Sequence, residues 1–122
     1  MTTWTPGELD EIGEAEELNL ASVRGDGTPR RSVPMWVVRA GDDLYVRSVN
    51  GRGSVWFRAA QTQHQARIRA GGVEKDVELV EVDANDEVDA AYRAKYGPRY
   101  PTIVPTIVAP EARAATLKLV PR

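Results

Sequence analysis

Residues 27–60 read GTPRRSVPMWVVRAGDDLYVRSVNGRGSVWFRAA, a stretch in which strand-like runs alternate with glycine-bearing turns. Residues 30–40 and 44–49 are rich in β-branched and aromatic side chains, and a Gly-Asp-Asp turn separates them. The pattern predicts two successive antiparallel strands. A second turn with two glycines follows, and Ser54 is a suitable N-cap for a helix that reaches about residue 62. Strand, strand and helix therefore form the centre of the predicted fold.

The segments on either side extend this pattern with further hairpins and two more helices. Thr5-Pro6-Gly7-Glu8 has the form of a capping box, and Gly71-Gly72 is a two-residue hairpin signal. Residues 98–110 contain four prolines and apolar side chains that favour burial, so we expect a structured loop. The other predicted elements are a helix from the capping box to about residue 17, strands at 18–24, 66–70, 73–82 and 115–120, and a helix at 85–96 capped by Asn85.

Six antiparallel strands with hairpin connections, and a helix inserted after the third, predict a mainly β protein. We expect a six-stranded antiparallel split or closed β-barrel with about three short helices, formed as a single domain over residues 1–122. Closing the sheet would remove exposed strand edges. Pro34 lies inside the second strand and cannot donate to a ladder, so this position should be at an edge, at a bulge or facing a ligand.

Composition excludes several classes of protein. The chain has no cysteine and one histidine, His64, so thiol chemistry, disulfides and most zinc or Ser-His-Asp sites lack the required residues. No metal site is expected. The sequence has no apolar leader segment and no long uncharged span, so neither secretion nor membrane insertion is supported. We therefore expect a cytoplasmic protein that does not bind membranes.

The net charge of −2 conceals a local excess of arginine. Residues 24–58 contain seven arginines and three acidic residues, while the first seventeen residues contain six acids and no base. Arginine forms bidentate contacts with phosphate and carboxylate groups, so the cluster favours a small anionic ligand. A solvated, salt-bridged surface is the alternative for most of these arginines individually. A pI near 5.4 argues against nucleic-acid binding.

The turn RSVNGRGS at residues 47–54 has the parts of a phosphate cradle. Its glycines permit positive φ, and the following helix begins with unpaired N–H groups. Arg47 and Arg52 add charge, while Ser48 and Ser54 add hydroxyl donors. The alternative is an ordinary connection between a strand and a helix, because glycine-bearing turns are common at such positions.

Two tryptophans lie near this turn and could form the wall of a ring-binding pocket. Trp36 follows Pro34 by two residues, and Trp56 lies in the first turn of the predicted helix. A flat ring system needs an apolar or aromatic wall, and backbone groups freed at a strand irregularity could meet its polar atoms. The alternative for each tryptophan is ordinary core packing.

The stretch quoted above resembles the core of the FMN-binding split-barrel superfamily, which includes deazaflavin (F420)-dependent nitroreductase-like and pyridoxamine-phosphate-oxidase-like proteins. The chain as a whole, from WTPGELDEIGEAEELNLASVR through GGVEKDVELVEVD and AAYRAKYG to EARAATLKLVPR, resembles the DUF2255 family. The resemblance implies a cofactor site at a homodimer interface. The resemblance and the phosphate cradle together give these expected cofactor-binding residues: Arg30, Arg31, Pro34, Met35, Trp36, Arg47, Ser48, Asn50, Arg52, Ser54 and Trp56.

These observations and the resemblance lead to one main expectation. The protein should be a flavin- or deazaflavin-binding oxidoreductase that uses FMN or F420 on a small organic substrate; no side chain is assigned as catalytic. The first alternative is a non-redox protein or enzyme that uses the same pocket for a carboxylate or phosphorylated ligand. The second is an interaction domain without a small-molecule ligand. Asp26 lies near the expected phosphate position, a departure from the relatives that leaves FMN, F420 and an empty pocket open.

Overall fold

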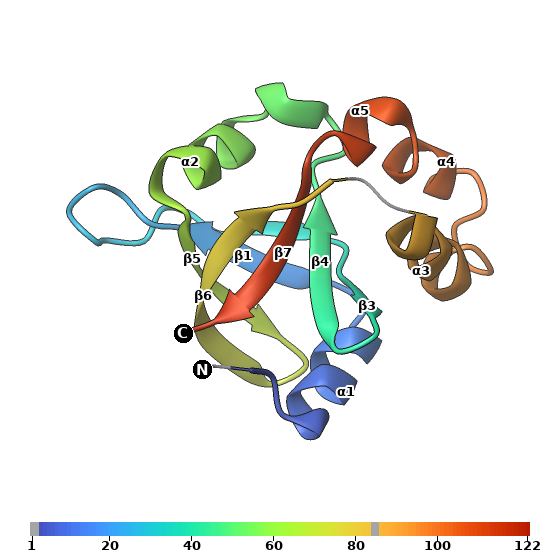
Figure 1. Ribbon diagram of the computed structural model, residues 1–122, viewed down its shortest axis with the longest axis horizontal. Helices are drawn as coiled ribbons and strands as arrows, with labels where there is room; N and C mark the ends of the chain where they lie inside the picture. Colours follow the sequence, from blue (N-terminus) through green and yellow to red (C-terminus); the bar gives the residue numbers. More distant parts are fainter. Residues whose placement is uncertain (1–2, 84–85) are drawn as a thin grey trace.

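One antiparallel sheet of seven strands forms the centre of the computed structural model, which describes residues 3–83 and 86–122. The sheet curls into a half-barrel (Figure 1), so the mainly β fold is confirmed with one strand more than predicted. Its strand order is β2-β1-β5-β6-β7-β4-β3. The strands are β1 (Leu18–Ser22), β2 (Val33–Met35), β3 (Val38–Ala40), β4 (Asp43–Arg47), β5 (Gln65–Ala70), β6 (Val73–Glu81) and β7 (Thr116–Pro121).

The additional strand arises because the predicted strand at residues 30–40 is broken in two. β2 pairs with β1 and β3 pairs with β4, so the two halves lie at opposite edges of the sheet. Between them, the Val37 N–H donates to the Tyr96 hydroxyl (3.2 Å), and the Val37 carbonyl accepts from Lys95 Nζ (2.7 Å). These side chains take the backbone groups that a continuous ladder would use. The prediction of one strand was wrong, whereas the edge position of Pro34 is confirmed.

The helices lie around the sheet as α1 (Pro6–Glu14), α2 (Val55–Gln63), α3 (Asp86–Tyr96), α4 (Val104–Ile107) and α5 (Pro110–Arg113), with a 3₁₀ turn, η1, at Gly51–Gly53. The predicted capping box is confirmed: the Glu8 N–H donates to Thr5 Oγ1, and the Thr5 N–H donates to Glu8 Oε1. α1 ends three residues earlier than predicted. α4 forms within residues 98–110, which were expected to be a loop, and α5 begins at the last residue of that region. The predicted cap at Asn85 lies outside the described residues.

Two apolar cores hold the elements together. The main core lies inside the curled sheet and includes Leu9 and Ile12 of α1 and Phe57 of α2. Phe57 and Ala60 of α2 are buried, whereas Trp56 is only half-buried. The second core lies between the sheet and α3, α4 and α5, which Figure 1 shows together on one side. Alternation along β4 places Leu44 in the first core and Tyr45 against the second.

The β5–β6 hairpin turns at Gly71 and Gly72, as predicted. Both glycines have positive φ, 56° and 84°. A Cβ atom at Gly71 would lie 2.4 Å from the carbonyl oxygen of Glu11, so only glycine fits where the hairpin meets α1. Among the described residues, the structure has no helix with the length and apolar character needed to cross a membrane.

Candidate functional site

A hollow of about 430 Å³ opens between β2, the end of β4, the start of α2, and α4. Eight of the eleven predicted site residues line it: Pro34, Met35, Trp36, Arg47, Ser48, Asn50, Ser54 and Trp56. The remaining lining residues are Glu17, Val33, Val49, Ile103, Thr106 and Ile107. We call this site the hollow. It brings together β2 and the glycine turn after β4, although β2 and β4 are not neighbours in the sheet.

Serine hydroxyls and helix N–H groups form the polar corner of the hollow. Ser48 Oγ and Ser54 Oγ lie 2.8 Å apart, and Gly51 has a φ of 79° in the turn between them. Ser54 occupies the N-cap position of α2, but its side chain makes no capping hydrogen bond to the helix. The first N–H groups of α2 therefore lack a side-chain cap, and such groups attract anions and carbonyl oxygens.

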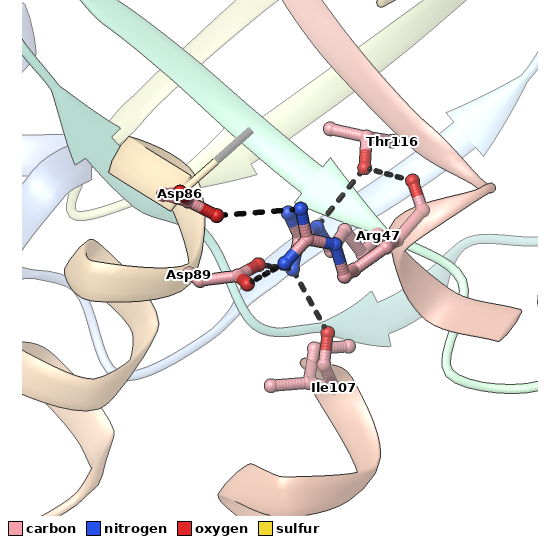
Figure 2. Close-up of polar contacts among 6 residues, drawn as sticks. Arg47, Asp86, Asp89, Ile107 and Thr116 are labelled. Carbon is pink, nitrogen blue, oxygen red and sulfur yellow. Dashed lines mark hydrogen bonds and ion pairs between the residues drawn. The ribbon is translucent and has the colours of Figure 1, made fainter. Parts of the chain in front are cut away.

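The sequence had predicted that Arg47 adds positive charge to this corner, and the structure shows that it does not. Its side chain is fully buried and forms an ion pair with Asp89, in which Nη1 lies 2.5 Å from Oδ1 (Figure 2). Nη1 also donates to the Ile107 carbonyl (3.1 Å), and Nε donates to Thr116 Oγ1 (3.0 Å). Asp89 accepts a further hydrogen bond from Arg113. Because Asp89 neutralises it, the Arg47 guanidinium joins β4 to α3 and α4 and is unavailable to hold a phosphate.

Arg52 also lies apart from the hollow. Its guanidinium donates to Glu81 Oε1 (2.7 Å) and to the Ala114 carbonyl (2.9 Å), and it lies 5.5 Å from the Phe57 ring centroid. These contacts place Arg52 among β6, α5 and the start of β7. Of the two arginines expected in the cradle, neither presents a free charge to the hollow.

Arg30 and Arg31 lie in a separate groove that adjoins the hollow. The groove has a volume of about 410 Å³ and shares Val33 and Trp56 with the hollow. We call it the arginine groove; it is lined by Ser22, Arg24, Arg30, Arg31, Val33, Val55 and Trp56. Within residues 3–83 and 86–122, Arg24, Arg30 and Arg31 have no carboxylate partner in an ion pair. The positive charge expected at the turn is therefore found here.

Asp26 is turned inward within its own hairpin loop. Its carboxylate accepts from the Thr28 N–H (3.0 Å) and the Thr28 hydroxyl (2.7 Å), and these bonds, the hydroxyl first, hold the pKa of Asp26 below its usual value. Asp26 lines neither the hollow nor the arginine groove. Its presence therefore does not disqualify the groove as an anion site.

The sequence analysis missed the wall contributed by α4 with the residue before it, and by the segment between α1 and β1. Ile103, Thr106 and Ile107 come from the proline-rich segment, for which only burial had been expected. The preference of isoleucine for burial was the available signal. Glu17 gave no such signal, because nothing in the sequence distinguishes it from the other acidic residues near it.

Trp36 packs against Tyr96 of the second core and against Tyr100, which is packed on that core. The Trp36 and Tyr96 rings stack with centroids 4.1 Å apart and an interplanar angle of 4°. The Tyr96 hydroxyl is bound to the main chain of Val37 and of Glu16. Tyr92 and Tyr96 are both buried. One wall of the hollow is therefore a rigid aromatic stack.

Lys95 beside this stack provides a prediction on pH. Burial lowers the pKa of Lys95 to about 8, against an opposing effect of Glu16. In the unfolded chain lysine keeps its proton to about pH 10.4, so between pH 8 and 10 the unfolded state binds more protons and the free energy of unfolding rises with pH. Lys95→Met lacks this contribution. Urea unfolding should show wild-type stability rising relative to Lys95→Met from pH 8 to 10; parallel pH profiles would contradict the burial of the charge.

Comparison with known sequences places the chain in a family. The family model described as an uncharacterized protein conserved in bacteria, DUF2255, matches residues 8–119. The chain belongs to the DUF2255 family. The resemblance expected from the sequence is thus confirmed over nearly the full length. No curated protein matches significantly.

Solved structures share the split-barrel fold of this DUF2255 protein at low sequence identity. An F420 reductase is 20% identical with a TM-score of 0.57, covering 98% of this chain and 94% of that protein. The haem storage protein HutZ from Vibrio cholerae is 18% identical with a TM-score of 0.62, covering 96% and 89%. A FAD-binding protein from Mesorhizobium loti is 13% identical with a TM-score of 0.53, covering 98% and 91%. These likenesses establish the fold.

Proposed function

We propose that this DUF2255 protein binds a flavin- or deazaflavin-type cofactor, FMN or F420, and acts as an oxidoreductase on a small organic substrate. One observation carries the proposal. A hollow of ring-binding size between Trp36 and Trp56 adjoins, at Val33 and Trp56, a groove whose arginines have no carboxylate partner among the described residues. An apolar ring slot beside a cationic groove fits a ligand that has a flat ring at one end and a phosphate-bearing chain at the other.

The residues present fit such a cofactor. The hollow is within the range of about 300–1,000 Å³ that is usual for small-molecule sites. Trp36, Met35 and Trp56 would contact the ring, the Ser48–Ser54 corner would meet its polar edge, and Arg30 or Arg31 would hold the phosphate. A bound flavin or deazaflavin supplies the electron or hydride transfer itself, so the protein needs no cysteine or histidine at the site. The side chains bind the ring, orient it and limit its exposure to water.

The names of two structural neighbours, an F420 reductase and a FAD-binding protein, support a flavin-type ring. A third neighbour stores haem, and haem proteins commonly use a histidine as proximal ligand. The single histidine of this chain, His64, is exposed at the C-terminal end of α2 and does not line the hollow. This position favours a flavin-type ring over haem.

Titration of the purified protein with FMN, FAD and F420 tests the proposal. We expect at least one of them to bind with a Kd in the micromolar range or below, and to quench the emission of Trp36 and Trp56, which line the hollow. The absorption spectrum of the protein as purified identifies any cofactor that is retained. If none of the three binds while a carboxylate or phosphorylated metabolite raises the melting temperature, the non-redox alternative replaces this proposal.

We also propose that the protein is a homodimer with the hollow at its interface. Three exposed apolar side chains border the hollow and the arginine groove: Val49, Val55 and Ile103, which are 46%, 81% and 48% exposed. Clustered exposed apolar groups are typical of contact surfaces. Sedimentation equilibrium should give a dimer mass for the wild type and for Val80→Asp, whose exposed valine lies away from these sites on β6, and a monomer mass for Val55→Asp. A monomeric wild type would contradict the proposal.

A further inference from the structure

Trp36 joins the hollow to tyrosine rings that lead to the surface. It lines the hollow on one side and stacks on Tyr96 on another, at a centroid distance of 4.1 Å. Its centroid lies 5.4 Å from that of Tyr100, with the rings tilted by 37°. Rings in direct contact exchange electrons readily, because their π orbitals overlap without an intervening saturated chain.

We propose that Trp36, Tyr100 and Glu16 form a one-electron path between the hollow and the protein surface. The inference rests on the proposed function, since the oxidant at the inner end is a light-excited flavin-type ring held in the hollow. The path would carry oxidising equivalents away from the ring and deliver them to the solvent-facing side of Tyr100.

The outer end of the path is set by a proton acceptor. The Tyr100 hydroxyl donates to Glu16 Oε1 at 2.5 Å, and Arg99 pairs with the other carboxylate oxygen. An oxidised tyrosine becomes a strong acid and must release its phenolic proton to remain as a neutral radical. The Glu16 carboxylate is a base in contact with that proton. Its side chain is 46% exposed, so it can pass the proton on to water.

Tyr96 also stacks on Trp36 but cannot be the end of the path. Its hydroxyl donates to the main-chain carbonyl of Glu16 (3.0 Å) or of Val37 (3.2 Å), and carbonyl groups do not accept a proton at neutral pH. Lys95 Nζ lies 4.8 Å from the Tyr96 ring centroid and, when protonated, disfavours a positive charge on that ring. The tyrosyl radical therefore forms on Tyr100.

The electrons and protons of the two steps balance. First, Trp36 loses one electron to the light-excited flavin-type ring and becomes a radical cation. Second, Trp36 regains an electron from Tyr100, and the Tyr100 phenolic proton moves to Glu16. The products are a neutral Tyr100 radical and a protonated Glu16. The only co-reactant is the ring in the hollow, and light supplies the energy for the first step.

The first test needs no bound cofactor. A ruthenium polypyridyl photosensitiser with persulfate oxidises the apo protein by one electron, and transient absorption with freeze-quench electron paramagnetic resonance follows the radicals. In the wild type, and in the control Tyr45→Phe, a tryptophan radical should decay as a tyrosyl radical appears. In Tyr100→Phe the tryptophan signal should persist and the tyrosyl yield should fall several-fold. An unchanged tyrosyl yield in Tyr100→Phe would overturn the inference.

Glu16→Gln distinguishes proton acceptance from a merely structural role. Glutamine keeps a hydrogen-bond acceptor for Tyr100 but removes the base, so we expect tyrosyl formation to slow several-fold and to acquire a larger solvent isotope effect. Equal rates in Glu16→Gln and the wild type would overturn the role of Glu16.

The second test applies to protein loaded with FMN. Illumination of the bound FMN should produce a Tyr100 radical in the wild type, and Trp36→Phe should abolish it. A wild-type yield in Trp36→Phe would overturn the path through Trp36. Failure of FMN to bind would count against the proposed function alone, because the apo experiment judges the aromatic path independently.

Discussion

Replacing Asp89 by alanine should destabilise the protein by about 3–5 kcal/mol, the usual effect of removing one partner from a buried ion pair. Asp89 is 3% exposed and neutralises Arg47, whose side chain has no exposure at all (Figure 2). Without Asp89, the Arg47 guanidinium would remain as an uncompensated charge between β4, α3 and α4. Arg113, the second partner of Asp89, is about one-third exposed and can turn to solvent. Urea unfolding at pH 7 measures the change.

Two further variants keep this prediction testable even if Asp89→Ala does not fold. Arg47→Met combined with Asp89→Leu removes both charges together, and we expect it to regain most of the lost stability, because burying the pair also carried a desolvation penalty. Asp86→Asn is the matched control. Asp86 contacts Arg113 at 3.4 Å but is almost fully exposed, so its loss should change stability by less than about 1 kcal/mol. A loss below 1 kcal/mol in Asp89→Ala would show that the buried pair is not required.

The Arg47 network also determines the shape of the hollow. Arg47 Nη1 donates to the carbonyl of Ile107, and Ile107 is part of the hollow's wall. Nη2 of the same guanidinium has no hydrogen-bond partner among the described residues. The arginine expected to hold a ligand directly instead holds α4, and through it one wall of the site.

Local signals in the sequence were sufficient for most of the fold. The capping box at Thr5, the Gly71-Gly72 turn and the alternation along β4 each depend on neighbouring residues, and each is present in the structure. The break between β2 and β3 could not be predicted in this way. It depends on Tyr96 and Lys95, which bind the main chain of Val37 from nearly sixty positions away.

The candidate site shows the same division between local and distant information. Residues 34–36 and 47–56 meet at the hollow. Both segments lie within residues 27–60, so their sequence patterns were sufficient to identify them as site residues. The predicted positions of the Arg47 and Arg52 charges were wrong, because a buried or half-buried guanidinium binds whichever carboxylate the fold brings to it. Asp89 for Arg47 and Glu81 for Arg52 lie 42 and 29 residues away, and no spacing rule in the sequence connects them.

The charges that remain free lead to the second large effect, which concerns affinity. In protein that binds FMN, the double variant Arg30→Ala with Arg31→Ala should raise the Kd about 100-fold. Each charge-assisted bond to a phosphate contributes about 1.5–3 kcal/mol, and every 1.4 kcal/mol changes the Kd tenfold; exposure to solvent places the expected effect at the low end. Both side chains are exposed and have no carboxylate partner in the part of the chain that the structure describes, so folding should be unaffected. Titration by FMN fluorescence measures the Kd.

Arg52→Ala is the control that separates the two possible phosphate positions. It removes an equal charge from the glycine turn, but its guanidinium is bound to Glu81 and to the Ala114 carbonyl. We therefore expect its Kd to stay within about twofold of the wild type. The opposite result, with Arg52→Ala weakening FMN binding and the double variant leaving it unchanged, would place the phosphate at the η1 turn and remove the arginine groove from the site. Raising the salt concentration should reduce the difference between the wild type and the double variant, because exposed arginines are screened.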